Sequence, residues 1–89
     1  MDQEMFETEA SNDGFDVQKR KLAPGTNNPE HTHPFDARLY ELSGEITIEC
    51  NGETNTYGPG DDCRMDAETP HTEVVEDEEV VFLVGRRPR

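Results

Sequence analysis

The sequence predicts an all-β domain folded as a compact β-barrel or a double-sheet jelly roll. Seven or eight short segments have the apolar pattern of strands, and turn-forming residues separate them at regular intervals. Glycines fall in turns and prolines fall where strands begin or end, while no segment shows sustained helical periodicity. We divide the single domain into an acidic N-terminal arm, residues 1–13, and the β-barrel itself, residues 14–89.

The first third of the chain supplies two of these segments. Residues 1–13 are rich in acids with few apolar anchors, so we expect a loose arm or a weak edge strand. Residues 15–22 alternate imperfectly, which predicts a strand with one solvated face. Residues 23–29 are dense in Pro, Gly and Asn and predict a loop. A short extended piece over residues 30–33 is expected to end at Pro34, which lacks a backbone donor.

A hairpin in the middle of the chain is the clearest element. A strand over residues 38–42 leads through a Ser-Gly turn to residues 45–50, in which apolar and polar residues alternate cleanly. Asn51 and Gly52 are the strongest short-range signal for a two-residue type I′ turn. The sequence therefore predicts a return strand over residues 53–57.

Three further strands complete the pattern. We expect them over residues 62–66, 71–75 and 80–84, each preceded by turn-forming or charged residues. The last strand is apolar enough to be covered on both faces. Gly85 is expected to end it, which leaves residues 86–89 as an exposed tail.

Size and composition imply a thin core. The chain has 89 residues, of which 30% are hydrophobic, against about 45% in typical domains. Because a metal ion or a second subunit often supplements such a core, we expect a homodimer. Cys50 and Cys63 lack Cys-x-x-Cys spacing, so we expect both to be small core residues.

The formal net charge of −13, from 21 acids against eight bases, argues against several partners. Binding of DNA, RNA or an anionic membrane depends on neutralising phosphates, which this surface would repel. The composition fits a salt-adapted host or an ordinary acidic cytosolic protein. The first residues lack a signal-peptide pattern and no stretch approaches about 18 apolar residues, so we expect a cytoplasmic protein.

The three histidines stand at the spacing of metal ligands. His31 and His33 are two residues apart, so in an extended segment they share one face, about 6.6 Å apart along the strand. His71 must then arrive from a strand distant in sequence, as an all-β fold allows. The alternative is three scattered surface histidines. We hypothesise that the three imidazoles gather around one metal ion.

These residues resemble the small single-domain members of the cupin superfamily. The first motif of that family runs Gly, five residues, His-x-His, three or four residues, Glu, six residues, Gly. This chain has Gly25, His31, His33 and Gly44 at that register. The resemblance implies a cupin-type jelly-roll barrel with the histidines lining its interior.

The second cupin motif is matched in part. It includes a Gly-Asp turn, then Pro-x-Gly, then His, and this chain offers Gly60, Asp61 and, after Pro70, His71. The Pro-x-Gly turn is replaced by the sequence Asp-Ala-Glu at residues 66–68. The resemblance implies His31, His33 and His71 as metal ligands, for a divalent transition metal such as Zn, Fe, Ni or Mn.

The glutamate of the first motif is missing, because its position is occupied by Ala37. Three neighbouring acids are candidates to replace it: Asp36, which would need the loop after Pro34 to turn it inward; Glu41, at about 13 Å along the strand; and Glu73, which shares a face with His71 at about 6.6 Å. Otherwise water or a ligand would complete a three-histidine site.

Three functions are consistent with such a site. Three ligands with open positions favour a reactive site over a closed structural one, so the first is an enzyme acting on a small molecule, of oxygenase or isomerase type, with unassigned catalytic residues. The second is a non-catalytic module that binds or senses a small molecule. The third is a metal or histidine cluster that only stabilises the thin barrel. A metal-free cupin epimerase would need inward-facing basic residues, and Arg38, the one candidate, has the parity of an outward, solvated residue.

Overall fold

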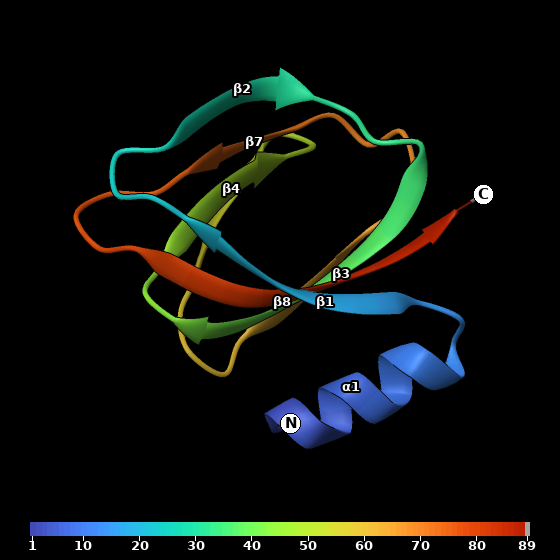
Figure 1. The fold of residues 1–89 in the computed structure, drawn as a ribbon. Helices are drawn as coiled ribbons and strands as arrows, with labels where there is room; N and C mark the ends of the chain where they lie inside the picture. The colour runs from blue at the N-terminus through green and yellow to red at the C-terminus, as the bar shows by residue number, and fades with distance from the viewer. Residues whose placement is uncertain (89) are drawn as a thin grey trace.

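The structure is a computed structural model that describes residues 1–88. In this part of the chain one helix precedes eight strands. The elements are α1 (Gln3–Asn12), β1 (Asp16–Leu22), β2 (Asn27–His31), β3 (Phe35–Ser43), β4 (Ile46–Cys50), β5 (Glu53–Tyr57), β6 (Asp62–Met65), β7 (His71–Val74) and β8 (Val80–Pro88). The strands form two four-stranded antiparallel sheets, with the orders β1-β8-β3-β6 and β2-β7-β4-β5 (Figure 1).

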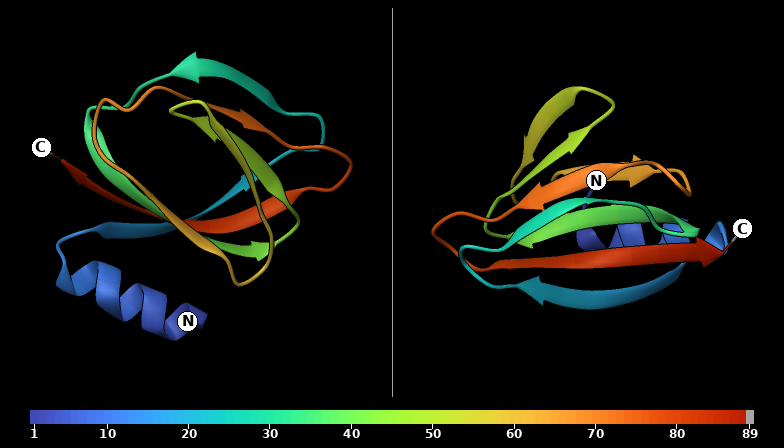
Figure 2. Two further views of the ribbon diagram at one scale, coloured as in Figure 1. Left: turned by 180° about the vertical axis from the view of Figure 1, so that it is seen from behind. Right: turned by 90° about the horizontal axis from the view of Figure 1, so that it is seen from above.

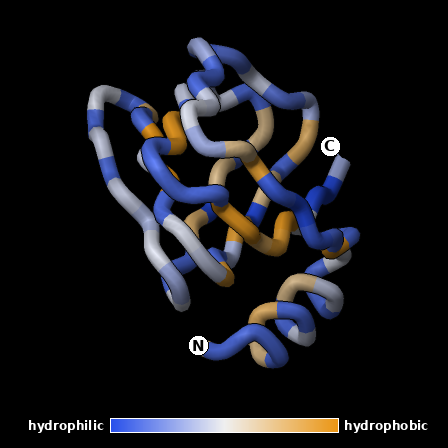
Figure 3. The backbone as a smooth tube through the Cα atoms, turned by 60° about the vertical axis from the view of Figure 1, so that its left-hand side comes forward, coloured by the Kyte–Doolittle hydropathy of each residue, from blue (hydrophilic) through white to orange (hydrophobic). Residues whose placement is uncertain are grey.

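The predicted all-β jelly roll is confirmed. Two further views show the two sheets facing each other, with α1 outside them (Figure 2). The main core lies between the sheets, and hydrophobic stretches of the chain run through the interior while the outer loops are mostly hydrophilic (Figure 3). The buried residues of this core are Leu39, Ile46, Ile48, Val75, Val80, Phe82 and Val84. The sheets remain two separate hydrogen-bonded sheets and do not close into one barrel.

The predicted hairpin is present between β4 and β5. Cys50 pairs with Glu53, so Asn51 and Gly52 form a two-residue loop. Both loop residues have positive φ, 55° and 79°, as a type I′ turn requires. Cys50 and Cys63, expected in the core, are half-buried and pack against its edge.

The expectation of an arm or edge strand at residues 1–13 is wrong, because this segment contains α1. The Asp2 side chain caps the helix by accepting a hydrogen bond from the backbone N–H of Met5 at 2.8 Å. Phe6 and Ala10, one turn apart, are fully buried, and Phe6 stacks on Tyr40 with ring centroids 5.4 Å apart. Two anchors are too few to give a helical period in the sequence. Among the described residues, no helix is long and apolar enough to cross a membrane.

Helix α1 buries the outer face of the first sheet and creates a second core. Leu83 contacts this core while Phe82 and Val84 contact the first, so β8 is covered on both faces, as expected. Arg38 does point outward, but the expectation that it is solvated is wrong. It is 8% exposed, because its guanidinium lies over the Phe6 ring at 5.2 Å, under the helix.

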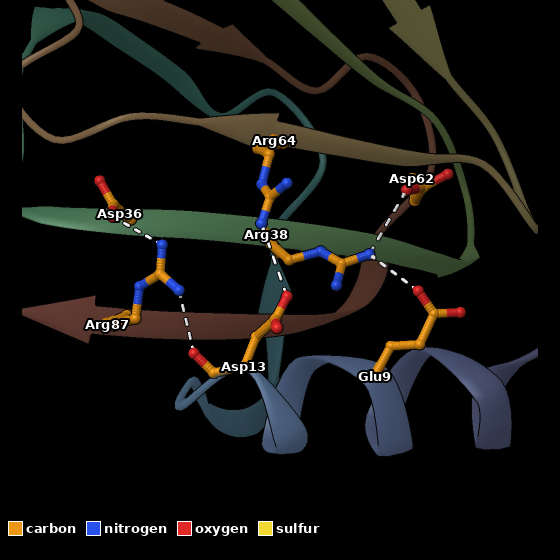
Figure 4. Close-up of polar contacts among 7 residues, drawn as sticks. All are labelled: Glu9, Asp13, Asp36, Arg38, Asp62, Arg64 and Arg87. Carbon is orange, nitrogen blue, oxygen red and sulfur yellow. Dashed lines mark hydrogen bonds and ion pairs between the residues drawn. The ribbon is translucent and has the colours of Figure 1, made fainter.

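Two strand boundaries also differ from expectation. Strand β8 does not end at Gly85 but continues to Pro88, because it pairs with β3 from Val81 to Pro88. Arg87 is therefore not part of an exposed tail; it pairs with Asp36 at 3.1 Å (Figure 4). Strand β2 begins at Asn27, within the predicted loop, and accommodates a proline because it is an edge strand. Arg89 lies outside the described residues.

Candidate metal centre

The three histidines converge, as the sequence predicted. His31 on β2 and His71 on β7 are direct cross-strand partners, and His33 follows two residues after the end of β2. The register between β2 and β7 shifts between Asn28 and His31, so a bulge sets the position of the histidine pair. One ligand atom from each of the three imidazoles lies within 4.8 Å of the others.

Backbone carbonyls fix the orientation of two of the rings. His31 Nδ1 lies 2.7 Å from the carbonyl oxygen of Pro29, and His71 Nδ1 lies 2.9 Å from that of Thr69. Because a carbonyl only accepts, each Nδ1 carries the proton and donates it, which leaves the Nε2 lone pair available to a ligand. Metal-binding histidines in proteins are held in the same way.

The third ring, His33, is kept neutral by its surroundings. Burial, followed by the nearby His31 and His71, lowers the pKa of His33 below its ordinary value. Its ring also stacks on Phe35, with centroids 4.8 Å apart. Neutral imidazole is the form that binds a metal. With metal–nitrogen distances of about 2.1 Å, coordinating nitrogens stand roughly 3–4 Å apart, so this donor set fits a transition-metal ion after a small contraction.

Glu73 is the acid that lies beside the histidines. One carboxylate oxygen is 3.9 Å from His31 Nε2 and the other is 3.9 Å from His71 Nε2. Asn28 Nδ2 donates a hydrogen bond of 2.9 Å to the same carboxylate and orients it. Of the three acids considered in place of the missing glutamate, Glu73 is therefore the one that the fold brings to the site.

The other two acids lie elsewhere. Asp36 faces the outside of β3, where one oxygen accepts from the backbone N–H of Ala67 at 2.8 Å and the other pairs with Arg87. Glu41 has the inward parity of Leu39, but it lies nearer to Asp61 than to the histidines and does not line their pocket. Neither acid is a fourth ligand in this fold.

A pocket of about 220 Å³ opens beside the site, between the two sheets. His33, His71 and Glu73 line one side, and apolar side chains that include Met65 and Phe82 line the other. This arrangement places the imidazoles and the Glu73 carboxylate against a small pocket with one apolar side. Such a pocket suits a small ligand.

A larger hollow lies elsewhere on the molecule. It has a volume of about 670 Å³ and is lined by exposed acids of two loops, among them Glu45 and residues 76–78. None of the histidines lines it. We place the candidate site at the smaller pocket, because that pocket holds the metal-ligating side chains.

Two arginines of this pocket, Arg20 and Arg86, were not expected from the sequence, and Lys21 also lines it. Strand parity could have found the first, because Arg20 shares a face with the inward-facing Leu22. The second was missed because β8 was expected to end at Gly85, one residue too early.

Comparison with known proteins identifies the fold. The family model described as "Cupin domain" matches residues 19–85. No curated protein sequence matches this chain.

Three solved structures illustrate the likeness. DMSP lyase DddQ from Ruegeria pomeroyi DSS-3 is 26% identical, with a TM-score of 0.74; the match covers 82% of this chain and 38% of that one. A predicted oxalate decarboxylase from Thermotoga maritima is 25% identical, with a TM-score of 0.72 and coverage of 92% and 74%. The Cupin_2 domain of an XRE family transcriptional regulator from Enterobacter cloacae is 28% identical, with a TM-score of 0.70 and coverage of 84% and 83%. This chain thus spans well under half of the lyase.

Proposed function

This chain belongs to the cupin family, and we propose that it is a metal-dependent enzyme that acts on a small molecule in the pocket beside His31, His33 and His71. One observation carries the proposal. Three imidazoles from two segments that are remote in sequence converge beside the pocket, and backbone carbonyls hold two of them with Nε2 free.

The residues around the centre have separable roles. A divalent ion held by the three histidines would act as a Lewis acid on a substrate oxygen, with positions left open for substrate. Glu73 lies close enough to serve as a fourth ligand or to accept a proton from bound substrate. The sequence favours oxygenase or isomerase chemistry, and the names of two similar structures add lyase and decarboxylase reactions to the classes worth testing.

Metal content tests the proposal. Protein purified without chelator is expected to hold about one equivalent of a divalent transition metal by elemental analysis, and His33→Ala is expected to lose most of it. Thr32→Ala is the matched control, because Thr32 is exposed and lies between the two histidines. Less than half an equivalent of metal, unchanged by His33→Ala, would contradict the proposal.

A sensing role is the second candidate, favoured by the likeness to the cupin domain of a transcriptional regulator. Turnover distinguishes the two. The metal-loaded enzyme is expected to consume substrate catalytically, whereas a sensor binds its ligand and returns it unchanged. If chelation lowers the melting temperature of the protein and neither turnover nor binding is found, the stabilising role stands instead.

A further inference from the structure

Arg86 lies next to the candidate metal centre. It shares its face of β8 with Val84, which contacts the core between the sheets, and its exposed side chain lines the pocket. Its guanidinium carbon is 5.1 Å from the centroid of the Phe35 ring, and Phe35 in turn stacks on His33. A positive charge therefore stands one aromatic ring away from the histidines.

Arg20 brings a second positive charge to the same pocket. It shares its face of β1 with Leu22, which packs against the core between the sheets. Its guanidinium is held in place by the Lys19 carbonyl oxygen at 3.0 Å and by the side-chain oxygen of Gln18. These two acceptors are uncharged, so the charge of Arg20 is oriented but not neutralised.

These two arginines differ from the others that the structure describes. Arg38, Arg64 and Arg87 each have a carboxylate within 4.0 Å (Figure 4). Among residues 1–88, no carboxylate comes within 4.0 Å of Arg20 or Arg86. Even Asp16, the cross-strand partner of Arg86, instead accepts a hydrogen bond from Gln18. In a chain with 21 acids and eight bases, two arginines of one pocket that no described carboxylate approaches within 4.0 Å point to a ligand that supplies a carboxylate.

We propose that the pocket binds a small organic acid, whose carboxylate pairs with Arg86 while the rest of the molecule extends towards the histidines. This inference rests on the proposed function and names its substrate class. Arg20, on the adjacent strand β1, adds positive charge to the same pocket. The volume of about 220 Å³ is below the roughly 300–1,000 Å³ of pockets for drug-sized ligands, so the acid has only a few carbons.

The strongly acidic surface does not prevent such binding. Exposed charges farther away than the Debye length, about 8 Å at physiological ionic strength, are largely screened, whereas the pocket arginines act at contact. The planar guanidinium matches a carboxylate with two parallel hydrogen bonds. A phosphate dianion suits the pocket less well, because the carboxylate of Glu73 lines it too.

Ligand titration followed by NMR tests the inference on the full chain, with and without one equivalent of Zn(II). The probes are propionate, lactate and succinate, their neutral amides, and inorganic phosphate. We expect the acids to bind at least tenfold more tightly than their amides. Arg86→Gln is expected to raise the Kd of the acids about tenfold to hundredfold, the usual effect of losing a charge-assisted hydrogen bond. Arg86→Lys is expected to restore part of the affinity.

Arg64→Gln is the matched control, because Arg64 is exposed and paired with Asp13 outside the pocket. Acids that bind no better than amides, or equal effects of Arg86→Gln and Arg64→Gln, overturn the inference; so does phosphate binding more tightly than every acid. If the protein binds zinc but binds the acids no more tightly than their amides, this inference is wrong and the proposed function stands. An acid preference that depends on Arg86 in protein that binds no metal keeps the inference and removes the proposed function.

Discussion

Among individual residues, Glu41 has a carboxyl group that is buried without a hydrogen-bond partner in the described part of the chain, which is unfavourable. Its side chain is 2% exposed, and neither carboxylate oxygen has a hydrogen-bond partner in the described part of the chain. Burial first, and the nearby Asp61 second, raise the pKa of Glu41 from 4.5 to about 8. The group is therefore protonated at neutral pH, and ionising it in the folded state is unfavourable.

This burial makes stability depend on pH. Between about pH 4.5 and 8 the folded protein retains a proton that the unfolded chain has released, so the free energy of unfolding falls as pH rises and levels off above the folded pKa. Glu41→Gln removes this dependence. Relative to the wild type, we expect the free energy of unfolding of the variant to rise by about 4 kcal/mol between pH 5 and pH 9, measured by chemical denaturation. Glu49→Gln, at an exposed position, is the control. Parallel pH profiles for Glu41→Gln and the wild type would disprove the assignment.

At the level of single residues, the convergence of the three histidines could be predicted from the sequence, but the residues around them could not. The spacing of His31 and His33 and the remote His71 sufficed to predict convergence, because strand alternation is a local property. The choice of Glu73 as the neighbouring acid could not be made, because it depends on strand pairing and on Asn28, which holds the carboxylate. The bulge that sets this register leaves no clear mark in the sequence.

At the scale of elements, close contact between turns limits which residues are tolerated. Gly44, in the turn between β3 and β4, has φ +74°, and a Cβ placed there would overlap the carbonyl oxygen of Glu79. Gly25 has a similar φ of +79° but no atom within 4 Å of such a Cβ. The two glycines thus separate the cost of the left-handed backbone from the cost of steric overlap.

Substitution by alanine measures the two costs. Gly25→Ala is expected to lower the free energy of unfolding by about 1 kcal/mol, through the backbone conformation alone. Gly44→Ala has the same unfavourable backbone conformation and must also displace the main chain at Glu79. We therefore expect it to lower the free energy of unfolding by about 1–3 kcal/mol more. Denaturant unfolding of the two variants checks the difference. Equal losses would show that the contact between the turns is not as close as described.

The elements themselves were predictable wherever local pattern decides. Clean alternation and an Asn-Gly turn sufficed for β4 and β5, whose boundaries differ from expectation by one residue at most. Helix α1 was missed because it buries only Phe6 and Ala10, and its stability comes from packing against Tyr40 and its neighbours. The continuation of β8 past Gly85 depends on pairing with β3, which is a tertiary effect.

For the whole molecule, the dominant quantity is the net charge of −13 on 89 residues. Mutual repulsion of surface carboxylates opposes a compact state, and the core between the sheets is small. Arginines counter the charge on the face covered by α1, where Arg64 and Arg87 join separate elements. The loop between β7 and β8 contains four consecutive exposed acids, residues 76–79, and none of them forms an ion pair with another described residue. The predicted homodimer and cytoplasmic location remain predictions.

Salt is therefore expected to stabilise the protein. The melting temperature should rise between about 20 mM and 1 M KCl, because the Debye length falls to about 3 Å at the higher concentration. A triple variant with Glu76, Glu78 and Glu79 replaced by Gln is expected to melt higher at low salt and to respond less to KCl. Calorimetry on both proteins checks this. A melting temperature that falls with KCl would show that attractive ion pairs outweigh repulsion.

Strand β2 is bonded to the rest of the molecule along one edge only, and its last residue faces His71 across that edge. An ion bound by both His31 and His71 would hold the end of β2 against β7 and reduce local opening of that edge. Amide hydrogen exchange at residues 27–31 should then slow on metal addition by a larger factor than exchange in β5, the opposite edge of the same sheet. Equal slowing at the two edges would mean that the ion stabilises the whole sheet and not strand β2 in particular.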